Sequence, residues 1–172
     1  MTNYPEILPK VDGQYHWLVT GAGGFIGSHL TEALLSMGQK VTGIDNFSTG
    51  YRHNIDMAVE ASGDPENFAF TEGTICSPET CRIVMNGVDY VLHHAAFVSV
   101  PASMGNPAKC FDDNAFGFVN ILEAARSNGV KRVVYATSSA VYGDDETMPK
   151  VETSIGRSLS PYALTKYVNE LF

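Results

Sequence analysis

Three side chains in the last third of the chain have the types and spacing needed for hydride and proton transfer at a carbinol carbon. Tyr162 and Lys166 are four residues apart, so on a helix they share one face. A neighbouring ammonium stabilises a phenolate, which makes the tyrosine a better general base. Ser138 follows a predicted strand and can hydrogen-bond the same substrate oxygen. We therefore predict Ser138, Tyr162 and Lys166 as catalytic residues.

A glycine-rich segment near the N-terminus is suited to binding phosphate groups. Gly21, Gly24 and Gly27 have the spacing G-x-x-G-x-x-G. Glycine lets the backbone turn sharply and come close to a pyrophosphate, and a following helix offers free N–H groups and the positive end of its dipole. Such a string alone is also typical of a simple tight turn. Its position between a predicted strand and a predicted helix favours dinucleotide binding.

An acidic residue at the end of the second predicted strand indicates which dinucleotide is bound. Asp45 comes 18 positions after Gly27. A carboxylate there accepts hydrogen bonds from a ribose 2′-hydroxyl and repels a 2′-phosphate. The alternative is a solvated aspartate in an ordinary turn. We predict NAD rather than NADP as the cofactor.

The elements that must position these residues alternate between strands and helices. Short apolar runs predict strands at 17–20, 41–45, 68–70, 90–93 and 133–136. Apolar spacings of three and four residues, with capping signals, predict helices at 25–37, about 55–60, 78–85, 112–128 and from about 162. This alternation implies βαβ units and a doubly wound, parallel α/β sheet of the Rossmann type.

The length and the position of the motifs suggest how the chain is organised. We expect residues 1–15 to form an N-terminal arm and residues 16–172 to form the dinucleotide-binding domain. Phe172 falls inside the last predicted helix, six residues past Lys166. We therefore expect an incomplete domain, with a C-terminal substrate-binding portion absent.

The composition excludes several classes of protein. The chain of 172 residues is 44% hydrophobic and 17% charged, which is typical of a globular domain. A net charge of −8 without a basic run disfavours binding to nucleic acid and to anionic membranes. We expect a cytoplasmic protein, because no apolar run approaches the roughly 20 residues of a membrane-spanning helix. Cys76, Cys81 and Cys110 show no metal-ligand spacing, so we expect reduced thiols and no metal site.

Five motifs together resemble the extended short-chain dehydrogenase/reductase family, and within it the UDP-hexose 4-epimerases, especially those acting on N-acetylated UDP-sugars. The motifs are residues 20–27 (TGAGGFIG), 45–47 (DNF), 93–96 (HHAA), 138–143 (SSAVYG) and 160–166 (SPYALTK). Residues 149–152 (PKVE) and 167–171 (YVNEL) strengthen the likeness to that subgroup. The resemblance covers about residues 16–172.

This resemblance implies an activity. The activity is epimerisation at C4 of a UDP-hexose through a 4-keto intermediate, with the N-acetylglucosamine and glucose series both open. Tyr162 would accept the hydroxyl proton while NAD takes the hydride, and Lys166 would hold the nicotinamide ribose. The resemblance also implies a homodimer that packs through the helices at 112–128 and from 160. We expect the 172-residue chain alone to have low activity.

The resemblance assigns further site residues. The implied cofactor contacts are Gly21, Gly24, Phe25, Ile26, Gly27, Asp45, Asn46, Thr74, Ile75, Ala95, Asn114, Tyr162 and Lys166. The implied substrate contacts are Ser99, Ser138, Ser139 and Tyr162. Two positions depart from the family pattern. Thr74 replaces the usual aspartate that binds the adenine amino group, and Ala102 replaces a frequent arginine.

Two other functions stay open at this point. One is NAD binding without catalysis. The other is a sugar-nucleotide 4,6-dehydratase or decarboxylase of the same family, which needs an acid beside the catalytic hydroxyl, where this chain has Ser139 and Ala140.

The remaining polar clusters have simpler interpretations. We expect His93 and His94 to be structural, because they have no partner at metal-ligand spacing. We expect Asp112 and Asp113 to cap the following helix. The acidic residues 144–146 are predicted to lie in a solvated loop.

Overall fold

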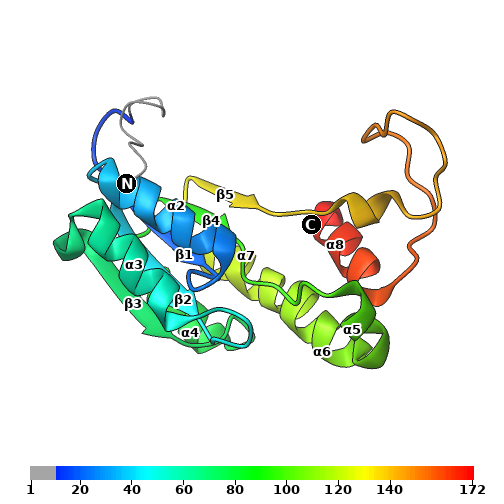
Figure 1. Ribbon diagram of the computed structural model, residues 1–172, viewed down its shortest axis with the longest axis horizontal. Helices are drawn as coiled ribbons and strands as arrows, with labels where there is room; N and C mark the ends of the chain where they lie inside the picture. Colours follow the sequence, from blue (N-terminus) through cyan, green and yellow to red (C-terminus); the bar gives the residue numbers. More distant parts are fainter. Residues whose placement is uncertain (1–10) are drawn as a thin grey trace.

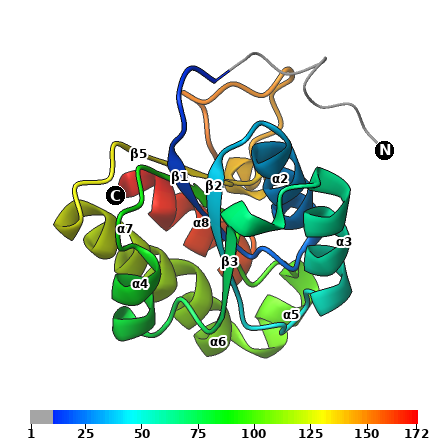
Figure 2. The ribbon, with the colours of Figure 1, turned by 90° about the vertical axis from the view of Figure 1, so that its left-hand side faces the viewer.

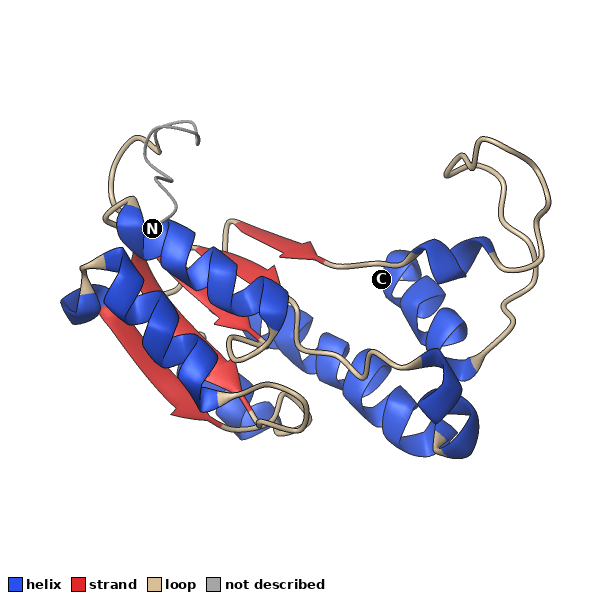
Figure 3. Ribbon diagram, in the orientation of Figure 1, coloured by secondary structure: helices blue, strands red, loops and turns tan. Residues whose placement is uncertain are grey.

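The computed structural model describes residues 11–172, which contain a parallel five-stranded sheet with helices on both faces (Figures 1 and 3). The strands are β1 (His16–Thr20), β2 (Lys40–Asp45), β3 (Phe68–Glu72), β4 (Tyr90–His93) and β5 (Arg132–Tyr135). Their order is β3-β2-β1-β4-β5, and every neighbouring pair is parallel. This is the doubly wound order with its switch point between β1 and β4, so the predicted fold class is confirmed.

The helices begin and end at the following residues. They are α2 (Phe25–Ser36), α3 (Arg52–Ser62), α4 (Pro78–Val84), α5 (Val100–Gly105), α6 (Pro107–Phe111), α7 (Gly117–Ser127) and α8 (Pro161–Leu171). Two short 3₁₀ helices, η1 (Pro65–Asn67) and η3 (Ser139–Tyr142), and a π-helical segment, η2 (Asp112–Phe116), complete the set.

The core has two layers because successive residues of a strand point to opposite faces of the sheet. Leu18 of β1 packs with Val84 and Ile121 under α4 and α7. Its neighbour Val19 packs with Leu34 and other residues under α2 and α3. Leu18 and Val19 are both fully buried. Figure 2 shows the two helical layers on either side of the strands.

The longest helical region differs from the predicted helix at 112–128. The helical backbone starts at Pro107 and runs without a break through α6, η2 and α7 to Ser127. Asn106 caps it, because the Asn106 side chain accepts a hydrogen bond from Lys109 N. The prediction that Asp112 and Asp113 cap this helix is therefore wrong, since both lie in its interior.

Helix α5 was not expected from the sequence. It starts after Ser99, whose side chain accepts a hydrogen bond from Ala102 N, and it has Pro101 in its first turn. Two other helices begin in the same manner, as predicted. Ser77 caps α4 and Ser160 caps α8, each followed directly by proline.

Helix α8 lies beyond the carboxyl end of the sheet (Figure 1). It contacts α5, α6, η2 and η3. Lys166 Nζ donates to the carbonyl of Ala136, one residue past β5, at 2.8 Å. The Thr137 hydroxyl donates to the carboxylate of Glu170. These two contacts tie α8 to the segment that leaves β5.

The predicted N-terminal arm falls only partly within the described residues. Its first ten residues lie outside them. Gln39, which is buried, accepts a hydrogen bond from Tyr15 N and donates one to Gly13 O, so this end of the arm is attached to the sheet. Among residues 11–172, no helix is both long enough and apolar enough to cross a membrane.

Candidate functional site

The glycine turn between β1 and α2 has a shape that two of its glycines make possible. Gly21 has a φ of +70°, and a Cβ there would lie 2.8 Å from Ala95 N. A Cβ on Gly27 would lie 2.1 Å from Gly21 O. Both distances are too short for any other residue. A Cβ on Gly24 would lie 3.2 Å from Gly21 O, so Gly24 is less constrained by the protein itself.

The N-terminus of α2 offers unpaired donors to an anion. Gly24 is its N-cap and provides no side-chain cap, and no acidic residue lies in the first turn. The first N–H groups of a helix have no intrahelical acceptor, and the helix dipole adds positive potential. The first two side chains of the helix, Phe25 and Ile26, are 80% and 52% exposed, so residues 11–172 leave this end accessible. These features fit a pyrophosphate.

Asp45 ends β2 as predicted and is buried. Its Oδ2 accepts a hydrogen bond from Gly23 N at 2.8 Å, and its Oδ1 accepts one from Phe47 N at 2.7 Å. The alternative of a solvated turn aspartate is therefore wrong. Two backbone donors fix the carboxylate beside the glycine turn. Each oxygen keeps a further lone pair for a ribose hydroxyl.

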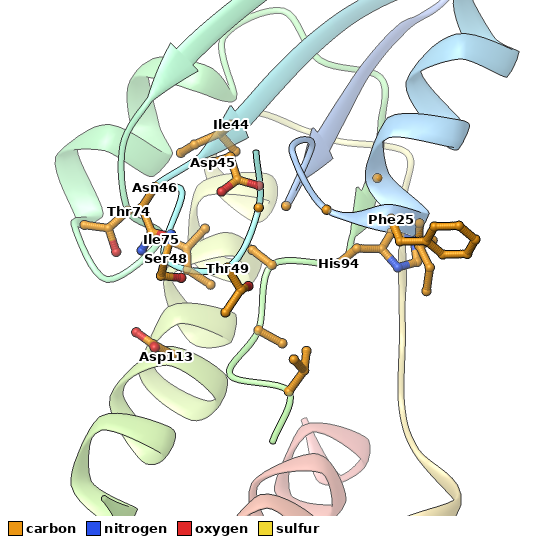
Figure 4. A pocket seen from close by; sticks show the side chains of 18 of the residues that line it. Phe25, Ile44, Asp45, Asn46, Ser48, Thr49, Thr74, Ile75, His94 and Asp113 are labelled. Atoms are coloured by element: carbon orange, nitrogen blue, oxygen red, sulfur yellow. The ribbon is translucent and has the colours of Figure 1, made fainter. Parts of the chain in front are cut away.

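The carboxyl ends of the central strands open into a cleft of about 400 Å³ (Figure 4). This is where open α/β sheets bind ligands. The predicted cofactor residues in its wall are Gly21, Gly24, Phe25, Ile26, Gly27, Asp45, Asn46, Thr74, Ile75 and Ala95.

Other residues of the cleft wall were missed by reasoning from the sequence. They are Ile44, Ser48, Thr49, Gly50, Gly73, His94, Ala96, Val98 and Asp113. Most of them neighbour a predicted residue in the chain, so a wider window around each motif would have included them. Asp113, from η2, directly precedes the predicted residue Asn114.

The predicted catalytic residues gather on α8 and η3, outside the wall of this cleft. Tyr162 and Lys166 belong to α8, and Ser138 caps η3, with its Oγ accepting a hydrogen bond from Ala140 N at 3.2 Å. Tyr162 N donates to Ser103 Oγ at 3.2 Å, which positions the first turn of α8. Burial lowers the pKa of Lys166, although its Nζ donates to the Ala136 carbonyl.

Asn114 has a positioning role in the protein and does not line the cleft. It is buried, and its Oδ1 accepts a hydrogen bond from Phe97 N at 2.7 Å. Its Nδ2 donates to Phe97 O at 3.1 Å and to Thr165 Oγ1 at 3.0 Å. The amide of Asn114 thus joins the segment after β4 to α8.

The predicted substrate contacts are placed differently from one another. Ser99 is half-buried, and its hydroxyl is occupied in capping α5. Ser139 is exposed in the first position of η3. Ser138 and Tyr162 are half-buried and belong to elements that contact each other.

The two adjacent histidines have different environments. His93 is buried, with its Nδ1 at 2.9 Å from Thr20 Oγ1, and burial lowers its pKa to about 3. This agrees with the structural role expected for it. His94 instead lines the cleft, and its Nδ1 has no hydrogen-bond partner among the described residues. Burial also lowers the pKa of His94.

Comparison with known proteins gives a family match and a set of similar proteins that carry related names. Residues 17–172 match the model of the NAD dependent epimerase/dehydratase family. UDP-glucose 4-epimerase from Streptomyces lividans is 36% identical over 159 residues, which are 91% of this chain and 45% of that protein. The chain spans about half the length of the curated relatives it matches.

Solved structures show the same likeness. UDP-N-acetylglucosamine 4-epimerase from Methanobrevibacter ruminantium M1, in complex with UDP-N-acetylmuramic acid, has a TM-score of 0.83 at 34% identity, covering 92% of this chain and 49% of that one. UDP-glucose-4-epimerase from Stenotrophomonas maltophila, with bound NAD and formylated UDP-arabinopyranose, has a TM-score of 0.84 at 31% identity, covering 91% and 47%.

These matches confirm the resemblance drawn from the five motifs, and NAD is the cofactor of the family, as predicted. The glycine turn, the buried Asp45 and the cleft fit that cofactor. With a family model matched over residues 17–172, the chain belongs to the NAD dependent epimerase/dehydratase family.

Proposed function

We propose that this chain is the NAD-binding part of a UDP-hexose 4-epimerase. The observation that carries the proposal is the cleft at the switch point of the sheet. Its wall combines the open N-terminus of α2 with the buried carboxylate of Asp45. The relatives named as UDP-glucose and UDP-N-acetylglucosamine 4-epimerases support the reaction.

In this proposal, each part of the site has a separate task. The N–H groups at the start of α2 hold the pyrophosphate, and Asp45 accepts the hydrogen bond of the adenosine ribose. Bound NAD supplies the acceptor and donor of the hydride at C4. Tyr162 takes the proton from the C4 hydroxyl and later returns it, while Ser138 hydrogen-bonds the same oxygen.

Lys166 has a structural and an electrostatic task in this proposal. The Ala136 carbonyl uses one of its three donors and holds the side chain against the end of β5. The remaining N–H groups are available for the nicotinamide ribose. Lys166 follows Tyr162 by one turn of α8, so in this proposal its positive charge is the group that offsets the negative charge formed when the proton moves.

The substrate class in this proposal is a UDP-hexose, with Ser99, Ser138, Ser139 and Tyr162 as contacts. The glucose and N-acetylglucosamine series are both represented among the relatives. We also propose a cytoplasmic homodimer. Phe111 and Phe116 support the dimer, because their ring centroids are 5.6 Å apart and both side chains are exposed on α6 and η2, which contact α8.

The two alternative functions are NAD binding without turnover and sugar-nucleotide dehydration. NAD binding without turnover is favoured by the half-length match to the relatives. A dehydratase requires an acid beside the catalytic hydroxyl. The residues after Ser138 are Ser139 and Ala140, which provide none.

Cofactor binding tests the proposal directly. Isothermal titration calorimetry of the chain is expected to show NAD bound about tenfold or more tightly than NADP, because Asp45 repels the 2′-phosphate. Asp45→Asn removes the charge and should narrow this ratio. Glu72→Gln is the matched control, because Glu72 ends the neighbouring strand β3, is exposed and does not line the cleft. Equal or tighter binding of NADP by the unaltered chain would overturn the proposal.

A further inference from the structure

The wall of the cofactor cleft contains a second carboxylate, Asp113, whose task is not explained by the glycine turn or by Asp45. It reaches the cleft from the π-helical segment η2, far from both of them in the sequence. Its side chain is only 14% exposed. Asp45 and Asp113 are the two carboxylate residues among the described residues that line this cleft.

The place of Asp113 in the cleft can be described relative to the start of α2, which fits the pyrophosphate, and to Asp45, which fits the ribose. Figure 4 shows Thr74 and Asp113 on one side of the cleft, and Phe25 and His94 on the other. In a dinucleotide, the base is joined to the ribose, and the ribose to the pyrophosphate. Since the start of α2 fits the pyrophosphate and Asp45 fits the ribose, the base attached to that ribose extends to the side of Thr74 and Asp113.

On that side, Asp113 is the acceptor best suited to an amino group. The Thr74 hydroxyl already accepts a hydrogen bond from Cys76 N at 3.2 Å. Ile75 is buried and offers an apolar surface for a base. Asn46 is exposed, and its side-chain oxygen already accepts from Ser48 N.

The carboxylate of Asp113 is held in place by its own neighbours. Lys109 Nζ forms an ion pair with it, one turn earlier in the helix. Cys76 Sγ donates to Asp113 Oδ1 at 3.2 Å. A carboxylate at neutral pH is an acceptor only and has about four acceptor positions, so it can receive one more donor but cannot donate to a carbonyl oxygen.

We propose that Asp113 accepts a hydrogen bond from the exocyclic amino group of adenine, and that it selects a 6-amino purine over a 6-oxo purine at this end of the cleft. The inference rests on the proposed binding of NAD. It adds a specificity-determining residue to that site.

The test compares NAD with nicotinamide hypoxanthine dinucleotide, in which a carbonyl oxygen replaces the amino group. Calorimetry on the 172-residue chain is expected to show NAD bound about tenfold to a hundredfold more tightly, because a carbonyl oxygen would face a carboxylate that cannot donate to it. Asp113→Asn should bring the ratio of the two affinities close to one, because an amide can accept from an amine or donate to a carbonyl.

Two further variants sharpen the comparison. Asp112→Asn is the matched control, because Asp112 is the exposed neighbour in η2, does not line the cleft and loses the same charge. Asp112→Asn should show the same ratio of affinities for NAD and its hypoxanthine analogue as the unaltered chain. If Asp113→Asn does not fold, as judged by circular dichroism, Asp113→Ser replaces it. That variant should weaken NAD binding and should strengthen binding of the hypoxanthine analogue, because the carboxylate that faces the carbonyl oxygen is removed and a hydroxyl can donate to it.

The outcomes separate this inference from the proposed function. An unchanged ratio in a folded Asp113 variant that still binds NAD overturns the inference alone. Loss of the ratio in Thr74→Val but not in Asp113→Asn makes Thr74 the acceptor and also overturns it. Failure of the unaltered chain to bind either dinucleotide overturns the proposed NAD site, and this inference with it.

Discussion

At the scale of single residues, the Thr20 side chain links the end of β1 to the residues that follow β4. It is fully buried, and its hydroxyl accepts hydrogen bonds from His94 N at 3.1 Å and Ala95 N at 3.0 Å. A hydroxyl has two acceptor positions and one donor. Its remaining contact, to His93 Nδ1 at 2.9 Å, must therefore use the hydroxyl proton. This fixes His93 as a neutral imidazole with its proton on Nε2.

The buried, neutral His93 predicts a pH dependence of stability. Burial lowers the pKa of His93 in the folded protein to about 3, against about 6.5 in an unfolded chain. Between these values the unfolded chain binds more protons, so the free energy of unfolding falls as the pH falls. The loss from one such group is at most about 1.4 kcal/mol per pH unit below about pH 6.5.

Urea unfolding at about pH 7.5, 6.5 and 5.5 measures this effect. The variant His93→Asn should be less stable than the unaltered chain but should show a smaller change in stability over this range. His53→Asn, at an exposed position of α3, should leave the slope as it is. A free energy of unfolding that stays constant from pH 7.5 to 5.5 would contradict the assignment.

At the scale of elements, Asn114 is the link between the cofactor half of the fold and α8. Its amide oxygen and nitrogen bind the backbone of Phe97, and the nitrogen also binds Thr165 on α8. Phe97 lies between β4, which ends at the cleft, and α5. Together with the contacts of Lys166, Glu170 and Tyr162 N, this side chain holds α8 in its place.

Asn114→Ala is expected to destabilise the protein by about 1–3 kcal/mol, because it leaves buried backbone and hydroxyl groups without partners. Chemical denaturation measures the change. Asn128→Ala is the matched control, because Asn128 is exposed at the end of α7 and should change stability by less than about 0.5 kcal/mol. If Asn114→Ala lowered the free energy of unfolding as little as the control does, the hydrogen bonds of Asn114 would not be what holds α8.

The elements also show which parts of the fold can be predicted from the sequence. Strands β1 and β4 are apolar runs that must be buried, and their predicted bounds agree with the structure to within a residue. The start of α8 was predicted because Ser160 and Pro161 form a cap recognisable in the sequence. The same signal at Asn106 and Pro107 was overlooked, so the long helix was predicted to start too late.

In the cofactor cleft, the glycine turn and Asp45 could be predicted from the sequence, whereas Asp113 could not. The glycine turn and Asp45 are local motifs with fixed spacing, and the structure brings them together as expected. Asp113 enters the cleft only because a π-helical segment from another part of the chain packs beside it. From the sequence, Asp113 was interpreted with Asp112 as a helix cap, and its neighbour Asn114 was predicted as the cofactor contact.

At the scale of the whole molecule, the structure contains a cofactor cleft and a separate cluster of predicted catalytic residues. The cleft lies at the carboxyl ends of the central strands, while Ser138 caps η3 and Tyr162 and Lys166 lie on α8. The chain spans about half the length of its curated relatives. Exposed apolar side chains on α8, such as Leu164 and Leu171, are available to be covered by further protein.

These features predict that the 172-residue chain binds NAD but turns over little or no UDP-galactose or UDP-N-acetylglucosamine. A chain extended with the C-terminal half of a relative should regain turnover. In that extended chain, Tyr162→Phe should lower turnover roughly a hundredfold or more with NAD still bound, because only the proton acceptor is removed. Turnover is measured by a coupled assay of the sugar product, and NAD binding is measured by calorimetry.

The control for that experiment is Tyr167→Phe, on the same helix and outside the predicted site, which should keep its turnover. Robust turnover by the 172-residue chain alone would contradict the expectation of low activity. Near-normal turnover by Tyr162→Phe would exclude Tyr162 as the base.

The π-helical segment η2 makes the length of the long helix as important as its composition. Asp113 faces the cofactor cleft, and the next residue, Asn114, faces the interior toward α8. A π-helical turn, with its i→i+5 hydrogen bonds, holds more residues than an α-helical turn. Removing one residue would close this segment to an ordinary α-helical turn, in which Asp113 and Asn114 could not both keep their present directions. We therefore expect this stretch to tolerate changes of residue type more readily than changes of residue number.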